Sequence, residues 1–543
     1  MLDSTKDNLV KVALLSLVEI ATKGTSDNVD IIAELGAIPK LIKLLDSKQK
    51  DCVNSSLQVL VAAKDHIKVH NHTTLLHHVI RIMNIEDSHQ SDRLLHCSEL
   101  LREILEADKP PVQTVGSGVI PRLIEILATT ENDIIRLHLI CSVDLFAGTK
   151  KQVDMLVKST GFLPVLVSLV KSQHDTISEK AITVLGKVVS MDETQHQDML
   201  LHAGIVKHLL RVLKESTFDK TLEATALVLS ACCRCRELND FATSKEALKA
   251  LTKLLMINNE AVVCNSCWAL YHILHHMTHD EVNEAISIGF IKPLLNLLQT
   301  PHNVQQPVLK SLHLLSSRGG ACVEAISHRN GISRLSKTLS STNQELATWT
   351  ISNLISGSRE QIQTAIDNNV VPSLAKMLTL EQNEKKSNKA ALWTLYQITK
   401  AGNASQIKYL ITEGCMNKLF DLFSNLECNC ATIGIWALKQ IIKVGKEQSP
   451  NKLCWLSSGV EDIETKLQEM MYVNLQCEQN TERIQLLEKK IAWLEVDQQN
   501  ECVESLKKAP GLLQEQLRDN DQRLQSIVEK IADVGEDSPL GQV

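Results

Sequence analysis

The stretch Gly36-Ala-Ile-Pro-Lys-Leu-Ile-Lys-Leu-Leu45 decides the fold of this chain, because it returns several times along the sequence. It comes back as Gly118-Val-Ile-Pro-Arg-Leu-Ile-Glu-Ile-Leu127 and as Gly161-Phe-Leu-Pro-Val-Leu-Val-Ser-Leu-Val170. The copies are spaced by about 42 residues, a period typical of helical solenoids, which present a long surface to other macromolecules. Shorter or weaker copies begin at Gly204, Gly289, Gly331, Asn369 and Gly414.

Each copy has the features of a boundary between two helices. The glycine suits the left-handed residue that ends one helix, and Pro39, Pro121 and Pro164 follow it in the first turn of the next. An apolar stretch with a helical period comes next, then a polar link, a longer amphipathic helix and a short helix that leads to the next glycine. This short, long, long unit resembles the armadillo repeat. A HEAT-type stack with two helices per unit is the alternative, and the Gly-x-Ile-Pro motif argues against it.

The resemblance implies an all-α fold, an armadillo-type right-handed α-solenoid (an alpha-alpha superhelix) followed by a C-terminal helical or coiled-coil segment. We expect N-terminal capping helices at 1–34 and a solenoid of about ten repeats at 35–448. Two double-length gaps between the glycines predict degenerate copies near 75–107 and 245–277. The remaining segments are expected to be a linker at 449–462, a coiled-coil-like helix at 463–506, a second amphipathic helix at 511–534 and a flexible tail at 535–543.

The segment after about residue 462 changes periodicity. A heptad pattern runs through it, with Ile484, Leu487, Ile491 and Leu494 in the best part of its seam, until a Pro-Gly pair interrupts the helix. Three interpretations stay open. The segment is a short coiled coil that binds itself or a partner, a helical hairpin that covers the last repeat, or a region that is disordered when unbound.

Composition and charge narrow the classes of function. Of the 543 residues, 44% are apolar and only 3% are aromatic, as expected for stacked helices built from Leu, Ile, Val and Ala. The net charge of −7 is uneven, because residues 461–543 carry 18 acidic and 9 basic residues, a net −9, which leaves +2 for residues 1–460. Neither part has the basic stripe that is typical of nucleic-acid binders. We therefore expect a protein partner and no nucleic acid.

Cysteine use and hydropathy indicate a reducing compartment. The 15 cysteines are spread along the chain, and the N-terminal residues lack the cationic start and apolar stretch of a secretory signal. The sequence has no run of 18 apolar residues, so no membrane span is expected. We predict a cytoplasmic protein, with the cytoskeleton or cilium and the nucleus as alternatives.

Four tryptophans recur at the same phase of the repeat, each followed four residues later by a side chain that can form hydrogen bonds. Residues at this spacing share one helix face. The pattern resembles importin-α, in which Asn amides bind the backbone of an extended peptide and Trp rings cradle its side chains. Only Trp349 and Asn353 match that pattern fully. The resemblance implies a partner-binding groove on the concave side of the solenoid, formed by Trp268, His272, Trp349, Asn353, Trp393, Gln397, Trp436 and Gln440.

A plainer interpretation is that each tryptophan packs between neighbouring helices and its polar partner faces water. If the groove exists, the charged side chains that line it determine which kind of ligand it binds. The segments 261–276, 388–400 and 430–443 contain four lysines and neither Asp nor Glu. Such a lining favours an extended neutral or acidic segment over the basic signals that importin-α binds.

No catalytic or metal-binding signature is convincing. Cys264 and Cys267 lie in a helix-forming run downstream of Cys232, Cys233 and Cys235, and we interpret them as small core residues and not as zinc ligands. The five histidines between residues 66 and 78 fit surface or capping positions. The sequence contains no phosphate loop and no protease, hydrolase or kinase motif. We therefore predict a chain that is not an enzyme and that holds no cofactor or metal.

Together these features predict a non-enzymatic protein–protein interaction scaffold or adaptor that binds partner segments along the concave groove. The C-terminal helices would serve for homo-oligomerisation or for a second partner. The alternatives are an importin-α-like nuclear transport cargo adaptor and a structural component of a cytoskeletal or axonemal assembly.

Overall fold

The computed structural model divides the chain into two compact units, residues 1–277 and 278–543, and each is described by itself. Most residues up to 444 are described. The described residues are 2, 7–23, 26–67, 69–85, 92–107, 119–191, 200, 204–235, 240–378, 385–415, 418–419, 433–434, 436–441, 443–444, 515, 518–519 and 522.

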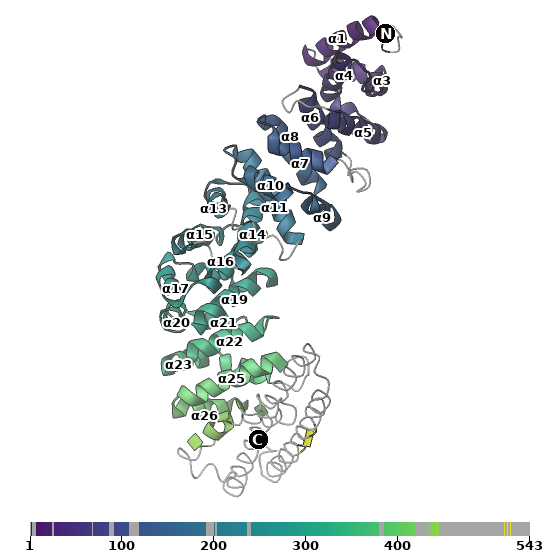
Figure 1. The fold of residues 1–543 in the computed structure, drawn as a ribbon. Coiled ribbons are helices and arrows are strands. Elements are labelled where there is room, and N and C mark those ends of the chain that lie inside the picture. The colour runs from purple at the N-terminus through teal and green to yellow at the C-terminus, as the bar shows by residue number, and fades with distance from the viewer. Residues whose placement is uncertain are drawn as a thin grey trace, which may run out of the picture. The chain divides into compact units, whose positions relative to one another are not determined.

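The first unit is a stack of helices (Figure 1), and its described residues include no strand. Most of its helices span two to five turns. They are α1 (Asp7–Lys23), α2 (Ser26–Glu34), α3 (Ala37–Leu44), α4 (Lys50–Ala62), η1 (Lys64–His66), α5 (Val69–Ile85), α6 (Asp92–Ala107), α7 (Val119–Thr129), α8 (Asp133–Phe146), α9 (Lys150–Lys158), α10 (Phe162–Val170), α11 (Asp175–Met191), α13 (Val206–Glu215), α14 (Asp219–Cys235), α15 (Phe241–Leu254) and α16 (Glu260–His276).

The second unit continues the same alternation of short and long helices. The last described residues of its repeats are helical and lie at 433–434, 436–441 and 443–444. We call them the terminal segment. The helices before it are α17 (His279–Ala285), η2 (Ile286–Ile288), α18 (Ile291–Asn296), η3 (Leu297–Gln299), α19 (His302–Ser317), α20 (Gly320–Ser327), α21 (Gly331–Ser336), α22 (Gln344–Ile355), α23 (Arg359–Asp367), α24 (Val370–Met377), α25 (Lys385–Ala401) and α26 (Ala404–Thr412).

The last helix of each repeat packs on the last helix of the next, and we call these the third helices. In the first unit they form the series α4, α6, α8, α11, α14 and α16, and in the second unit α19, α22 and α25. Leu, Ile and Val dominate the buried side chains between them. Each repeat therefore buries its apolar face against its neighbours, as in other solenoids. The predicted all-α solenoid is confirmed within each unit.

The repeated glycine has the predicted left-handed conformation at most positions. Gly36, Gly161, Gly204, Gly289 and Gly414 have φ between 69° and 91°. A side chain is strained in this region of φ, so glycine ends the preceding helix at the lowest cost.

At Gly331 this interpretation is wrong. The left-handed residue is Asn330, with φ 57°, and Gly331 is already the first residue of α21. Glycine is needed there because a Cβ would lie 2.4 Å from Cγ2 and 2.7 Å from the carbonyl oxygen of Ile326. The motif looks the same in the sequence, but here it serves close packing.

Arginines on the helix that follows the repeated glycine form hydrogen bonds to the preceding repeat. Arg122 on α7 donates to the carbonyl of Met83 in the last turn of α5 (3.0 Å). Arg211 on α13 donates to the carbonyl of Ser172 just after α10 (3.4 Å). A cation at the carboxyl end of a helix also interacts favourably with the helix dipole. Neighbouring repeats are thus joined by charge as well as by apolar contact.

Several predicted segments lie wholly or partly outside the described residues. These include the linker at 449–462, the tail at 535–543 and all but four residues of the second amphipathic helix at 511–534. The coiled-coil seam of Ile484, Leu487, Ile491 and Leu494 also lies outside them. The repeat number and the domain boundaries stay predictions.

No single helix in the described part of the chain is long and apolar enough to cross a membrane. The helices α9 and α10 reach the length and hydropathy of a membrane span only when they are taken together, and the pair is bent by 97° at the break between them. In α10, Phe162, Leu166 and Val170 are 2%, 1% and 0% exposed. The apolar character of α10 is therefore that of a core helix.

Candidate partner-binding site

Trp268 lies in the first unit, on α16. Asn259 caps this helix by accepting hydrogen bonds from the backbone N–H groups of Ala261 (3.1 Å) and Val262 (3.2 Å). The half-buried indole lies beside Tyr271 (ring centroids 6.0 Å apart, interplanar angle 82°) and His272 (5.9 Å, 24°). The predicted polar partner His272 therefore stacks on the tryptophan ring.

Trp349 and Asn353 lie in the second unit, on α22, and both are half-buried. Asn353 donates from Nδ2 to Oγ of Ser316 on the neighbouring third helix α19 (3.1 Å). Ser316 in turn donates to the carbonyl of His313 (2.9 Å). One N–H of the amide is thus used within the fold, and its second N–H and its carbonyl oxygen are the groups with which it could bind a peptide backbone.

Trp393, Tyr396 and Trp436 form a row of rings that we call the aromatic column. Tyr396 on α25 contacts both tryptophans, with ring centroids 5.6 Å from Trp393 and 5.7 Å from Trp436 on the terminal segment. These separations and the interplanar angles of 53° and 42° fall in the favourable range for aromatic pairs. Trp436 is 39% exposed, so the column reaches the surface.

Lys400 adds a cation to the aromatic column. Its Nζ lies 5.9 Å from the centroid of Tyr396, within cation–π range. A lysine of a basic ligand would make the same kind of contact with an aromatic ring. The chain therefore already places one of its own lysines over this ring.

Tyr271 and Tyr396 belong to the two ring clusters, and the sequence interpretation did not name them. The signal was present, because Trp268-Ala-Leu-Tyr271 and Trp393-Thr-Leu-Tyr396 repeat one pattern in two third helices. Residues three apart on a helix are neighbours on its surface. The tyrosines thus contact the tryptophan rings directly.

The predicted site residues fall into two groups. Within the second unit α22 packs on α25, and the structure brings Trp393 and Trp436 together through Tyr396. Gln397 is half-buried and Gln440 is exposed. Trp268 and His272 belong to the first unit, where they form a separate ring cluster with Tyr271.

Cations predominate on the third helices of the second unit. Among their described residues, Glu345 on α22 is the one carboxylate. Lysines are present on α19, on α25 and on the terminal segment, and those with exposed side chains near the aromatic column are Lys389, Lys400, Lys439 and Lys443. The described side chains of these helices therefore have a net positive charge.

The third helices of the first unit carry more carboxylates, but several of these are paired with cations. Glu99 and Glu103 on α6 lie 3.7 Å and 3.0 Å from Nζ of Lys64, and Asp144 on α8 lies 2.7 Å from Nζ of Lys187. Burial would raise the pKa of Glu103, but its hydrogen bond and charge interaction with Lys64 hold that pKa below its ordinary value. These carboxylates thus have partners within the fold.

The buried cysteines have the properties of core residues. Burial raises the pKa of Cys232 to about 12, and it also raises the pKa of Cys233 and Cys267. A thiol that stays protonated is a poor nucleophile and a poor metal ligand. In the part of the chain that the structure describes, no group of three or more His, Cys, Asp or Glu side chains is placed to hold a metal.

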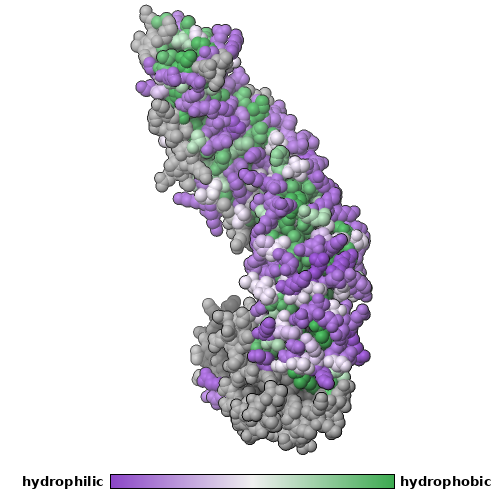
Figure 2. Space-filling model, turned by 180° about the vertical axis from the view of Figure 1, so that it is seen from behind, coloured by the Kyte–Doolittle hydropathy of each residue, from purple (hydrophilic) through white to green (hydrophobic). Residues whose placement is uncertain are grey.

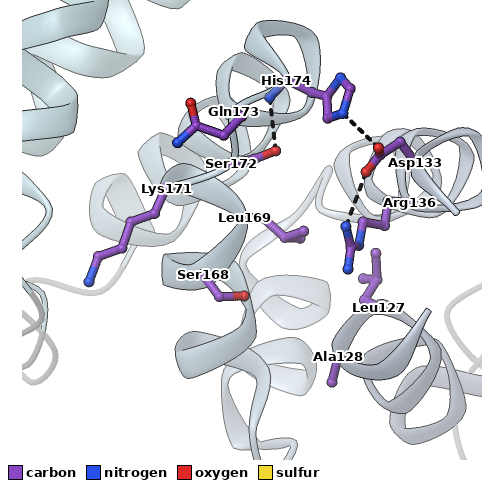
Figure 3. A pocket seen from close by; sticks show the side chains of 10 residues that line it. All are labelled: Leu127, Ala128, Asp133, Arg136, Ser168, Leu169, Lys171, Ser172, Gln173 and His174. Atoms are coloured by element: carbon purple, nitrogen blue, oxygen red, sulfur yellow. Dashed lines mark hydrogen bonds and ion pairs between the residues drawn. The ribbon is translucent and has the colours of Figure 1, made fainter. Parts of the chain in front are cut away.

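A pocket of 440 Å³ lies in the first unit, at the turns between α7 and α8 and between α10 and α11 (Figure 3). Two of its basic side chains point to one carboxylate: Arg136 lies 3.0 Å and His174 lies 2.6 Å from the oxygens of Asp133. None of its lining residues is a predicted site residue. The pocket is therefore distinct from the tryptophan sites.

No family model matches the chain, but comparison with known proteins found importin alpha subunits among its relatives. The chain is similar to importin subunit alpha-1b of Oryza sativa subsp. japonica, with 28% identity over 448 residues, 74% of this chain and 75% of that protein. It is also similar to importin subunit alpha-1a of the same organism (28% identity, 61% and 56% covered) and to importin subunit alpha-5 of Arabidopsis thaliana (26% identity, 78% and 83% covered).

A solved structure supports the fold independently. The crystal structure of an engineered protein aligns with 81% of this chain and 97% of its own, with a TM-score of 0.51 and 22% sequence identity. A likeness at this identity concerns the arrangement of the helices alone.

Proposed function

We propose that this chain, an armadillo-repeat protein by its fold and by its similarity to importin alpha subunits, is a non-enzymatic adaptor that binds other proteins. Its ligand is an extended segment of a partner, held along the third helices of the second unit. The aromatic column carries this proposal, because Trp436 is 39% exposed and continues into Tyr396 and Trp393. In protein interfaces a few residues carry most of the binding energy, and Trp and Tyr are enriched among them.

The charge around the aromatic column gives the class of ligand. Lys389, Lys400, Lys439 and Lys443 are exposed, and Glu345 is the one carboxylate among the described residues of these helices. A partner segment with acidic side chains beside apolar ones would satisfy both the lysines and the rings. The amides of Asn353, Gln397 and Gln440 are candidates for binding its backbone, as in the importin-α ladder.

A nuclear transport adaptor like importin-α is the second candidate, favoured by the names of the relatives and by the pair Trp349 and Asn353. Such an adaptor would take a basic signal. Two observations weigh against that ligand at the aromatic column: Tyr396 contacts both tryptophans, and Lys400 lies over the Tyr396 ring. The two candidates place the protein in the cytoplasm or in the nucleus, and the helices predicted at 463–506 and 511–534 would add self-association or a second contact.

Fluorescence anisotropy with two labelled peptides of equal length tests the proposal on the full chain. One peptide alternates Glu with Leu and the other alternates Lys with Leu. We expect the acidic peptide to bind more tightly and to weaken as salt is raised, because exposed charges are screened. Tighter binding of the basic peptide would favour the importin-like function and contradict the charge argument.

Matched variants locate the binding site. The change Trp436→Ala removes the exposed ring and should weaken acidic-peptide binding by roughly thirtyfold or more, as for an interface hot spot. Phe218→Ala removes a ring that is 66% exposed on the first unit and should leave binding unchanged. Equal losses in the two variants, or no loss in either, would remove the aromatic column from the proposed function.

A further inference from the structure

The first helix, α1, is apolar on two sides. Val10 and Leu14 are 6% and 1% exposed, and the helix packs on α4. Leu9, Val12 and Leu15 are 40%, 56% and 64% exposed. Figure 2 shows hydrophobic surface at the end of the first unit where α1 lies. A helix that only caps a solenoid would carry polar side chains on its outer side.

Exposed apolar side chains are concentrated in this region. Of the twelve large hydrophobic residues that are exposed in the described part of the chain, six lie between residues 9 and 35. Beyond the three on α1 named above, Ile20, Ile31 and Leu35 are 43%, 51% and 77% exposed. Single exposed apolar residues are ordinary, but a concentration of this kind marks an interaction surface.

The charges of α1 identify what covers this surface. Lys11, Leu15 and Glu19 are four residues apart and lie side by side on the helix, and Asp7 and Lys23 continue the series further round the helix at its two ends. The signs of this series reverse about Leu15. If a second α1 lies antiparallel with Leu15 against Leu15, then Lys11 of each copy faces Glu19 of the other. A parallel second copy would bring like charges together.

The ion pairs that these side chains make within one chain are weak enough to exchange. Lys11 lies 3.2 Å from Asp51, with side-chain exposures of 41% and 82%. Lys23 lies 3.1 Å from Glu19, with exposures of 76% and 68%. Exposed pairs of this kind contribute little to stability, because water and salt screen them. Exchanging them for pairs between two copies therefore has a low cost.

We infer that α1 is a contact between two copies of this chain, related by a twofold axis that passes beside Leu15. The interface is isologous, so each copy uses the same residues. Leu15 of each copy packs against Leu15 of the other at its centre with Val12 beside it, and one Lys11–Glu19 pair flanks this contact at each end. A single helix pair buries less area than a standard stable interface, so the dimer forms and dissociates with concentration.

Sedimentation velocity of the full chain over a range of concentrations tests this inference. We expect a reversible monomer–dimer equilibrium. Leu15→Glu places two carboxylates against each other on the axis and should raise the dissociation constant by at least about tenfold. Lys11→Glu alone should weaken the dimer, and the double variant Lys11→Glu with Glu19→Lys should restore it, because the reversed charges pair again. Circular dichroism melting verifies that each variant is folded, as expected for substitutions at exposed positions.

Controls separate this contact from any other route of self-association. Met256→Glu places the same charge on a residue of the first unit that is 70% exposed, and it should leave the dimer unchanged. All of these variants keep the C-terminal residues intact. A dimer that persists unchanged in Leu15→Glu and Lys11→Glu would therefore form elsewhere and overturn the inference, and so would a chain that stays monomeric at every concentration. Neither result bears on peptide binding at the aromatic column.

Discussion

Replacing Tyr396 by alanine tests whether the aromatic column couples α25 to the terminal segment. Tyr396 makes two ring contacts, one on each side, at 5.6 Å and 5.7 Å. Each such pair contributes about 0.5–1.5 kcal/mol beyond area burial, so losing both costs about 1–3 kcal/mol. Since about 1.4 kcal/mol corresponds to a factor of ten, the local opening equilibrium should shift by roughly 5- to 150-fold.

Native-state hydrogen exchange measures this shift where it occurs. A solenoid opens in parts, so a single unfolding midpoint would average over repeats that the substitution does not touch. We expect amides of α25 and of residues 436–441 to exchange faster by the factor above, while those of α10 in the first unit stay unchanged. The matched variant Tyr396→Phe keeps both ring contacts and should stay close to the parent.

Two results would refute the reasoning. Unchanged exchange in Tyr396→Ala would mean that the ring contacts hold nothing together. Equal acceleration in Tyr396→Phe and Tyr396→Ala would assign the effect to the hydroxyl group and not to the rings.

Two further predictions concern stability. Gly331→Ala should destabilise the second unit by about 1–3 kcal/mol, because the new Cβ meets the backbone of Ile326. Asn330→Gly should be neutral or stabilising, because glycine adopts the positive φ of this position without strain. Urea unfolding measures both changes, and equal effects would contradict the packing argument. Cys232 has a folded pKa of about 12 against an ordinary value of 9.0, so the unfolded chain loses this proton first. The protonated Cys232 thiol therefore makes its full contribution to the stability of the folded state below pH 9.0. That contribution is lost as the pH rises toward 12. Urea unfolding should therefore show a shallower alkaline loss in Cys232→Ala, and an identical pH profile would contradict this account.

The fold was accessible from the sequence because its information is local and repeated. A glycine, a proline and an apolar helical period recur with each unit, and each unit contacts only its neighbours. One period therefore predicts the next. The sequence wrongly predicted a left-handed conformation at Gly331 for the same reason. The repeated motif shows that glycine is needed there, but not whether a positive φ or close packing requires it.

The candidate site was only partly accessible. The phase of Trp349, Trp393 and Trp436 in the repeat follows from the sequence, and so does the lack of carboxylates near the last two. The contact of Tyr396 with both rings and the bond from Asn353 to Ser316 depend on distances between helices. Spacing along one helix does not give those distances.

By itself the sequence determined that this chain is an all-α solenoid, and the helical period showed which helices carry the four tryptophans. Tertiary structure alone decided which side chains fill the spaces between those rings and which apolar residues of α1 remain exposed. The physical reason is that helical periodicity fixes the face on which a residue lies. Whether a neighbouring helix covers that face is settled by the packing of repeats about 40 residues apart.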